Sequence, residues 1–341
     1  MCDMTFINVS GFFTSGSSAV VDLLKEFSDT YECKAEIRII KDPYGISQLE
    51  HSLVDSWELI NSSAAIADFL SLCRICSRTG GGSFPLARAG LSYCKTMSKD
   101  FMTITEEYID DLTSYKYAQD FYHTKFKKSY FKYVIDRCGR GLDKATKGNI
   151  KSLKKCIPQS YFSAPTQEQF NAATQKYFEK LYAEQAKNGR YIILDQAVSP
   201  NNPTVINRYF KSAKMIIVDR DPRDMFIDDI FNWGEKYFED MHSRDAGYKY
   251  AIRQKALRKG IVDDPNILCV RFEDVVLNYD VTKKKIMEFV GFSEEDHIRK
   301  REFLQVERSA KNVGIWKGKY EEYKDAIDAI AEEVPELCYN N

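Results

Sequence analysis

The chain has 341 residues, of which 44% are hydrophobic and 29% are charged, and its formal net charge at pH 7 is −1. This mixture is typical of a globular protein with a sizeable core and excludes a disordered chain. A nearly neutral chain is not a general polyanion binder, so we expect no nucleic-acid partner. We find neither a basic leader with a cleavage site nor a run of about 18 apolar residues, so we expect no signal peptide and no transmembrane segment.

Nine cysteines are scattered along the chain, and this odd number favours a reducing compartment. We therefore expect a cytoplasmic protein. Cys73 and Cys76 form a C-x-x-C pair, but no second pair and no pair of histidines follow at the spacing of a zinc site. The apolar helical pattern around them favours two thiols packed on one helix, so we expect no metal.

Short apolar runs, most of them rich in β-branched residues, mark the predicted strands. Each is nearly continuous in apolar character, as expected for strands that are buried on both faces of a parallel sheet. Helical patterns between several of them predict an α/β fold with helices on both sides of the sheet. The five runs are Thr5–Val9, Glu36–Ile40, Tyr191–Leu194, Met215–Val218 and Ile267–Phe272.

A turn rich in Gly and Ser follows the first run. Because a helix follows in turn, free backbone N–H groups and the helix dipole would favour an anion there. Gly11 and Gly16 have the spacing of a Walker A loop, but Ser17 stands where that motif requires Lys. The loop is therefore suited to an anionic group other than a magnesium-bound triphosphate. We expect Ser17 and Ser18 to cap the helix.

Residues 45–188 differ from the rest of the chain, with few strand patterns and many aromatic residues. We interpret this segment as a large helical insertion between the second and third strands, covering the acceptor side of one single domain, 1–341. Basic residues are concentrated between positions 125 and 155. They form either a solvated helical face or a cover over an anionic ligand. The aromatic residues belong to the core or stack on a sugar or flat ring.

Two further segments contain cations next to predicted strand ends or turns. "RDPRD" (220–224) ends the fourth strand, and an Arg at the carboxyl end of a parallel strand can bind a phosphate bidentately. "KNVGIWK" (311–317) predicts a donor-rich loop near the end of the chain. The alternative is an Arg–Asp surface turn formed by Arg220, Asp221 and Arg223, with Asp224 capping the next helix.

In combination these segments resemble the sulfotransferases that use 3′-phosphoadenosine 5′-phosphosulfate (PAPS). "FTSGSS" (13–18) is similar to the family's 5′-phosphosulfate loop, and "RDPRD" to the strand end that binds the 3′-phosphate. "RFEDVV" (271–276), "IMEFVGF" (286–292) and "KNVGIWK" follow in the family's order. The resemblance spans both ends of the chain but not its middle. It implies a three-layer parallel sheet with the topology of P-loop nucleotide hydrolases.

The second predicted strand, "YECKAEIRII" (31–40), resembles the corresponding segment of the tyrosylprotein sulfotransferases. That resemblance places the general base at Glu36 and an assisting cation at Arg38; the alternative is a strand-end carboxylate paired with Arg38. Other candidate bases are the histidines, His51, His123, His242 and His297. The nucleotide-binding residues that the resemblance implies are Thr14, Ser15, Gly16, Ser17, Ser18, Arg220, Arg223, Lys311, Asn312, Gly314 and Lys317.

The implied activity is transfer of a sulfuryl group from PAPS to a hydroxyl or amine acceptor, such as a carbohydrate or glycolipid, with no metal required. At three positions the chain departs from the family, which has a cation at Thr14, a Lys at Gln196 and a Ser at Asp228. Arg38, Arg223, Lys311 and Lys317 are candidate replacements for the lost cations. Two alternatives stay open, a P-loop kinase-like enzyme and a catalytically degenerate nucleotide-binding protein. The oligomeric state is not indicated.

Overall fold

A computed structural model of the chain describes residues 4–34, 36–80, 90–119, 121, 129–147 and 159–339. These residues divide into two compact units. The first, which we call the sheet unit, comprises residues 1–40, 95–99 and 178–341. The second, which we call the helical unit, comprises residues 41–94 and 100–177.

The sheet unit is built on a five-stranded sheet in which all neighbouring strands are parallel, in the order β2-β5-β1-β6-β7. This arrangement confirms the predicted α/β class and four of the five predicted strands. The strands are β1 (Thr5–Gly11), β2 (Thr30–Glu32), β5 (Tyr191–Asp195), β6 (Ala213–Asp219) and β7 (Ile267–Arg271).

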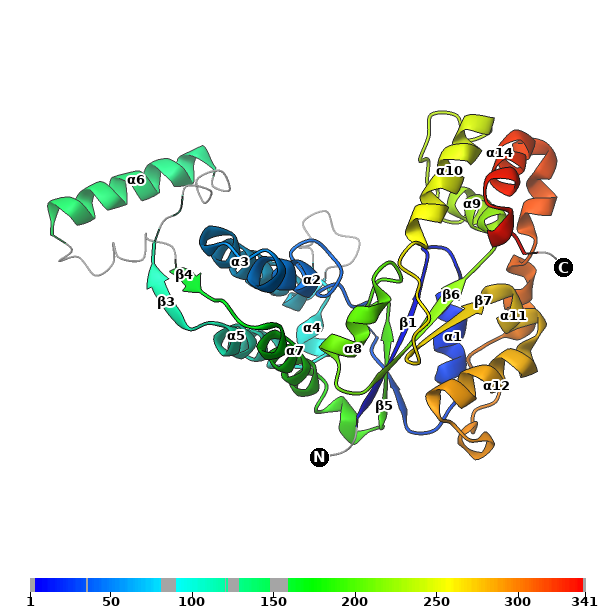
Figure 1. The fold of residues 1–341 in the computed structure, drawn as a ribbon, viewed down its shortest axis with the longest axis horizontal. Helices are drawn as coiled ribbons and strands as arrows, with labels where there is room; N and C mark the ends of the chain where they lie inside the picture. The colour runs from blue at the N-terminus through cyan, green and yellow to red at the C-terminus, as the bar shows by residue number, and fades with distance from the viewer. Residues whose placement is uncertain are drawn as a thin grey trace. The chain divides into compact units, whose positions relative to one another are not determined.

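Helices pack on both faces of this sheet (Figure 1). Ile7 and Val9 of β1 belong to the core that includes α1, α11 and α12, whereas Phe6 faces the opposite way, against the rings of Tyr182 and Phe210. This alternation is the period of two that a strand imposes. The helices of the sheet unit are α1 (Ser17–Leu24), α8 (Ile206–Tyr209), α9 (Pro222–Phe231), α10 (Arg244–Leu257), α11 (Phe272–Leu277), α12 (Tyr279–Val290), α13 (Val306–Ser309) and α14 (Tyr320–Glu333).

The predicted strand Glu36–Ile40 is wrong, because the second strand is β2, which ends four residues before Glu36. β2 pairs with β5 from Thr30 to Glu32, and the backbone N–H of Ile37 reaches the carbonyl of Asp195, the last residue of β5 (3.2 Å). Residues 38–40 therefore lie past the end of β5, where no neighbouring strand remains for them. Ile37, Ile39 and Ile40 are nevertheless buried, so the apolar pattern marked core residues rather than a strand.

The helical unit contains helices and a two-stranded antiparallel sheet that the sequence did not predict. Within the predicted helical insertion 45–188, α5 ends at Leu112, and Tyr115–Ala118 pairs with Gln159–Phe162. The described elements are α2 (Ile46–Glu50), α3 (Leu59–Ser77), α4 (Tyr93–Thr96), α5 (Phe101–Leu112), β3 (Tyr115–Ala118), α6 (Tyr130–Ala145), β4 (Gln159–Phe162) and α7 (Gln167–Leu181); α4 and α7 each end in segments of the sheet unit.

Helix α3 contains the C-x-x-C pair, with both thiols buried as free cysteines on one helix, as expected. Among the described helices, α3 alone is long and apolar enough to cross a membrane. A core helix of a soluble protein meets the same criterion, and Ile66, Phe69 and Leu70 of α3 are buried. The expectation of no transmembrane segment therefore stays a prediction.

Candidate functional site

The turn between β1 and α1 folds back on itself through Ser15. The Ser15 side chain is buried, and its hydroxyl accepts a hydrogen bond from the backbone N–H of Phe12 (3.0 Å). A Cβ at Gly11 would lie 2.0 Å from the Ser15 Oγ, so only Gly leaves room for this turn. Ser15 thus fixes the shape of the loop, and the nucleotide-binding role that the resemblance implies for it stays a prediction.

The amino-terminal end of α1 presents free backbone donors. Gly16 is the N-cap residue, in a left-handed conformation with φ of 82°, and no side chain caps the helix. The predicted caps Ser17 and Ser18 lie inside the helix instead. Within the described part of the chain, the N–H groups of Gly16, Ser17 and Ser18 have no hydrogen-bond acceptor. Such donors, together with the helix dipole, form an anion site.

Replacing Gly16 by Ala should damage this site. A Cβ at this position would lie 2.5 Å from the ring of Phe272, and the positive φ is strained for any L side chain. We expect the free energy of unfolding to fall by about 1–3 kcal/mol and nucleotide binding to be lost. Urea denaturation and calorimetric titration measure both effects. Gly318→Ala is the matched control, because no atom lies within 4 Å of its added Cβ; an equal loss in both variants would contradict the prediction.

Gln196, at one of the positions where the chain departs from the family, contacts the loop directly. Its Nε2 donates to the Ser17 hydroxyl (2.9 Å), and its Oε1 lies 3.5 Å from the backbone nitrogen of Gly11. The residue has a positive φ of 55° just after β5. A neutral amide therefore bridges the two ends of the loop, where the family's Lys would add a charge.

Arg220 joins three segments at the carboxyl ends of the strands. Its side chain is 2% exposed, and Nη1 donates to the carbonyl of Thr14 (2.8 Å) and to the carboxylate of Asp228 (2.6 Å). Nη2 donates to the carbonyl of Asn312 (2.7 Å). The two Nη atoms are thus engaged within the protein, while the buried Nε has no hydrogen-bond partner among the described residues. Asp228 holds the position where an anionic ligand of Arg220 would be expected.

The second Arg of "RDPRD" lies at the start of α9. Asp221 caps this helix by accepting from the backbone N–H of Arg223 (2.9 Å), and it also pairs with the Arg223 side chain (2.6 Å). The Arg223 guanidinium carbon lies 4.3 Å from the ring centroid of Trp316. The interpretation as an Arg–Asp turn is therefore correct in part, with Asp221 and not Asp224 as the cap.

Asp224 holds the late loop in place. Its carboxylate accepts hydrogen bonds from the backbone N–H groups of Gly314 (2.7 Å) and Trp316 (3.1 Å). Burial raises the pKa of Asp224, and these two N–H groups oppose that shift. The loop is built from two short 3-10 helices, η7 (Ala310–Asn312) and η8 (Ile315–Lys319). Lys311 and Lys317 are exposed on it, so their cations remain accessible.

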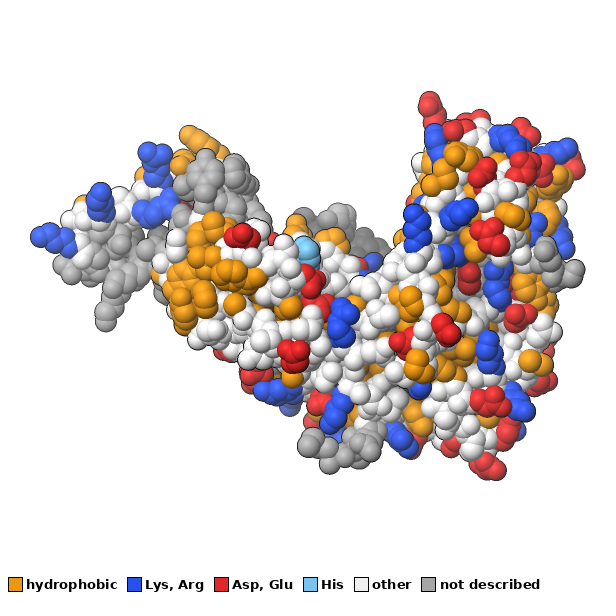
Figure 2. Space-filling view, viewed as in Figure 1, with side chains coloured by type: hydrophobic (Ala, Val, Ile, Leu, Met, Phe, Trp, Pro, Cys, Tyr) orange, Lys and Arg blue, Asp and Glu red, His pale blue; other side chains and the backbone are white. Residues whose placement is uncertain are grey.

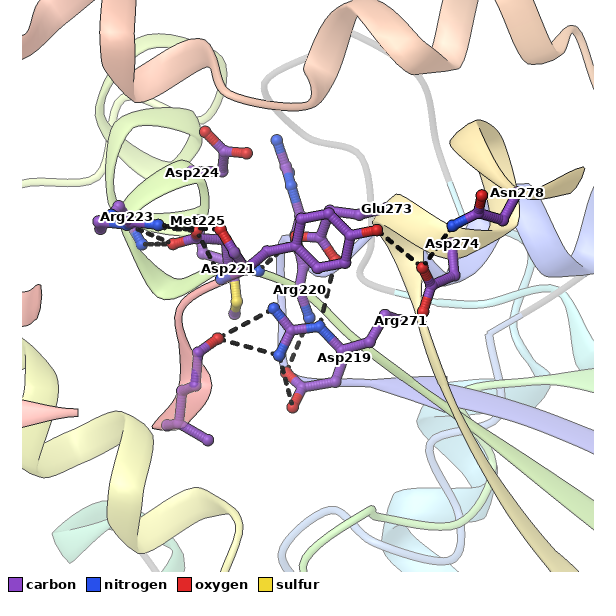
Figure 3. A network of polar contacts seen from close by, with 12 residues as sticks. Asp219, Arg220, Asp221, Arg223, Asp224, Met225, Arg271, Glu273, Asp274 and Asn278 are labelled. Atoms are coloured by element: carbon purple, nitrogen blue, oxygen red, sulfur yellow. Dashed lines mark hydrogen bonds and ion pairs between the residues drawn. The ribbon is translucent and has the colours of Figure 1, made fainter. Parts of the chain in front are cut away.

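A network of ion pairs supports this strand end (Figure 3). Asp219, the last residue of β6, pairs with Arg258, the residue that follows α10 (2.5 Å). Glu273 accepts from the backbone N–H of Asp221 (2.7 Å) and pairs with Arg271 (3.3 Å). Burial raises the pKa of Glu273, with Arg271 opposing that shift. Sequence reasoning missed Arg258, because no motif connects α10 with β6.

Glu36 and Arg38 lie beyond the end of β5, next to the segment that contains Gln196. The backbone N–H of Ile37 between them bonds to Asp195, the neighbour of Gln196. The side chain of Glu36 is 39% exposed, and its Oε1 lies 3.6 Å from Nη1 of Arg38. The structure thus forms the ion pair of the alternative interpretation, and the role of Glu36 as the base stays a prediction.

The histidines offer weaker candidates for a base. His297 is buried, and its Nε2 lies 2.8 Å from Glu26, beyond the carboxyl-terminal end of α1 and away from the loop. His242 stacks on Tyr323, and His51 is exposed in the helical unit. His123 lies outside the described residues. Within the described ranges, no group of three or more His, Cys, Asp or Glu side chains is placed to hold a metal ion.

Part of the sequence is similar to a known protein family. A family model described as "Sulfotransferase family" matches residues 133–296. No curated protein matches the sequence. Among solved structures, a sulfotransferase domain from the curacin biosynthetic pathway is 13% identical, with 98% of each chain covered and a TM-score of 0.40. A sulfotransferase domain of an olefin synthase from Synechococcus PCC 7002 is 12% identical, with 99% of this chain and 95% of that chain covered and a TM-score of 0.40. Sulfotransferase STF1 from Mycobacterium tuberculosis H37Rv is 10% identical, with 99% and 77% covered and a TM-score of 0.39.

The matched range covers slightly less than half of the chain. It includes β5, β6 and β7 together with the "RDPRD" strand end and the "RFEDVV" segment. The match confirms, over residues 133–296, the resemblance to the sulfotransferase family that these motifs predicted.

Proposed function

We propose that the protein transfers a sulfuryl group from PAPS to a hydroxyl or amine acceptor. The observation that carries this proposal is the set of free N–H groups at Gly16, Ser17 and Ser18, at the carboxyl end of β1. The same edge of the sheet holds the "RDPRD" strand end and, through Arg220 and Asp224, the loop 311–317. A 5′-phosphosulfate fits the first feature, because these amides would neutralise its charge.

The fit to the 3′-phosphate is less complete. Arg220 is the cation expected to bind it, but its Nη1 is already paired with Asp228. A phosphate at this position requires that Asp228 turn away or be neutralised. Arg223, Lys311 and Lys317 supply further positive charge at the same edge. We therefore expect wild-type protein to bind the nucleotide weakly.

The transfer step forms a bond between the acceptor oxygen and sulfur and breaks the bond from sulfur to the oxygen of the 5′-phosphate. Adenosine 3′,5′-bisphosphate leaves, and the acceptor proton passes to a base. Positioning and charge stabilisation supply most of the rate acceleration in reactions of this type. In our proposal Glu36 takes the proton, and Arg38 holds the Glu36 carboxylate in place.

Glu36→Gln should separate chemistry from binding. We expect turnover to fall by about 10²–10⁴-fold, the range for loss of a general base, while affinity for adenosine 3′,5′-bisphosphate stays within about twofold. Steady-state kinetics with PAPS and calorimetric titration with the bisphosphate measure the two quantities. Glu32→Gln is the matched control, since Glu32 lies on β2 and pairs with Lys25 (3.6 Å). Full activity of Glu36→Gln would reject Glu36 as the base.

Calorimetric titration of wild-type protein tests the donor assignment. We expect binding of adenosine 3′,5′-bisphosphate and no tighter binding of ATP with magnesium. Preference for ATP with magnesium would favour a P-loop kinase-like enzyme, although the loop lacks the Walker Lys. Binding of the bisphosphate without turnover on any hydroxylated acceptor would favour a degenerate nucleotide-binding protein. Absence of bisphosphate binding would overturn the proposal.

For the acceptor, we propose a hydroxylated molecule, with a carbohydrate or glycolipid as the favoured class. Many aromatic residues of the helical unit are core residues; Tyr108 and Tyr177, for example, are buried and stacked on each other. Aromatic rings that could stack on an acceptor are the exposed ones, such as Tyr115.

The basic residues between positions 125 and 155 are described only in part. Four of them lie on α6 and one follows it: Lys132, Arg137, Arg140, Lys144 and Lys147. The others lie outside the described residues: Lys125, Lys127, Lys128, Lys151, Lys154 and Lys155.

For the location, we propose the cytoplasm. The described cysteines, seven in number, are all free thiols, which is typical of a reducing compartment. We propose no nucleic-acid partner, because acidic and basic side chains are interspersed over the visible face of the sheet unit (Figure 2).

A further inference from the structure

Position 14 of the phosphate loop lacks a cation, and the structure shows how its Thr is used. The Thr14 hydroxyl lies 3.4 Å from the carbonyl oxygen of Met225 and hydrogen-bonds to the carboxyl group of Asp229. Both partners are on α9. Thr14 is therefore tied to the protein, and a charge for the bound anion has to come from another residue.

A cation from α10 packs on the neighbouring residue of the same loop. The guanidinium carbon of Arg253 lies 5.0 Å from the ring centroid of Phe13 and 4.5 Å from that of Tyr237. Phe13 is 64% exposed and has a positive φ of 56°. Tyr237 also hydrogen-bonds to Arg253, so two aromatic side chains hold the guanidinium, and its remaining N–H groups can donate to a ligand.

Arg253 differs from the other arginines around the site in its charge balance. Arg220, Arg223, Arg258 and Arg271 each have a carboxylate oxygen within 3.3 Å. For Arg253, no ion pair is found among the residues that the structure describes. The carboxyl group of Asp229 acts on Arg253, but it also hydrogen-bonds to Thr14, Tyr237 and Tyr250, the last at 3.1 Å. Burial raises the pKa of Asp229, and these hydrogen bonds together with Arg253 oppose that shift, so Asp229 is shared among several partners.

We propose that Arg253 supplies the positive charge that the phosphate loop lacks at position 14 and binds the anionic 5′-group of the nucleotide. Phe13 and Tyr237 position the guanidinium, and Asp229 with Thr14 fixes the loop against α9. This inference rests on the proposed function for the identity of the nucleotide, but the anion site itself does not depend on it. Arg253 was not among the candidate replacements considered from the sequence.

Arg253→Gln tests the inference by calorimetric titration with two probes, adenosine 3′,5′-bisphosphate and inorganic pyrophosphate. We expect both probes to bind about 10- to 100-fold more weakly than to wild-type protein, the range for loss of a charge-assisted hydrogen bond. Arg253→Lys should recover part of the affinity, because it keeps the charge but loses the planar stacking. Arg244→Gln, on the same helix and exposed, is the matched control and should bind as wild type.

The outcomes distinguish this inference from the proposed function. If wild-type protein binds pyrophosphate but not the bisphosphate, the donor assignment fails, and a loss of pyrophosphate binding in Arg253→Gln still supports the inference. If wild type and Arg253→Gln bind both probes equally, the inference is overturned while the donor assignment stands. Binding of neither probe by folded wild-type protein overturns both. Thermal denaturation of each variant verifies that it is folded.

Discussion

Replacing Arg220 by Ala should lower the free energy of unfolding more than breaking any exposed ion pair does. The variant removes a guanidinium that is 2% exposed and leaves the Asp228 carboxylate without its cation. The carbonyls of Thr14 and Asn312 lose their donor as well. Breaking a buried pair from one side costs about 3–5 kcal/mol, so we expect the free energy of unfolding to fall by about that amount. Nucleotide binding should be lost together with it.

Urea denaturation of three variants tests this prediction. Arg244→Ala breaks an exposed pair with Glu332 and should change the free energy of unfolding by at most about 1 kcal/mol. Arg220→Met combined with Asp228→Asn removes both charges and should recover a large part of the stability that Arg220→Ala loses, because no unpaired buried charge remains. An Arg220→Ala variant as stable as Arg244→Ala would show that Arg220 does not hold the three segments together.

Much of the sheet was predictable from local patterns. The central strands β1, β5 and β6 are mostly apolar because both of their faces are buried, and such runs are visible in a single sequence. The edge strand β7 is less buried, with Cys269 exposed, but its run is equally apolar. The second strand was misplaced because Ile37, Ile39 and Ile40 are buried without pairing in the sheet. Buried residues have the same apolar sequence pattern whether or not they pair in a sheet, so this pattern alone does not identify a strand.

The site was predictable only where it follows a motif. The loop 13–18 and the "RDPRD" strand end lie at the same edge of the sheet, as the order of motifs implied. The contact of Arg253 with Phe13 joins residues far apart in sequence, and no local pattern signals such a contact. The use of Asp228 as the partner of Arg220 was likewise not predictable, although its unusual identity was noted. Side-chain partners depend on packing across elements, which composition and spacing do not specify.

Asp228→Ser should tighten the binding of adenosine 3′,5′-bisphosphate by about 10- to 100-fold. The substitution removes a carboxylate that competes with the 3′-phosphate for Arg220, and it restores the residue type of the resembling family. Two like charges about 4 Å apart near a protein surface repel by about 4 kcal/mol, which more than covers the expected gain. Adenosine 5′-phosphate, which has no 3′-phosphate, should bind wild type and variant equally.

One control for this variant keeps the negative charge on a longer side chain, and the other removes it at constant side-chain shape. Asp228→Glu retains the carboxylate and should show no gain, whereas Asp228→Asn removes it and should behave as Asp228→Ser. Without a ligand, Asp228→Ser should be less stable than wild type, since Arg220 loses its buried counterion. The bisphosphate should restore that stability by binding the folded state. Equal calorimetric affinities of wild type and Asp228→Ser for the bisphosphate would mean that Arg220 does not meet the 3′-phosphate, and the donor would have to bind through Arg223, Lys311 or Lys317 instead.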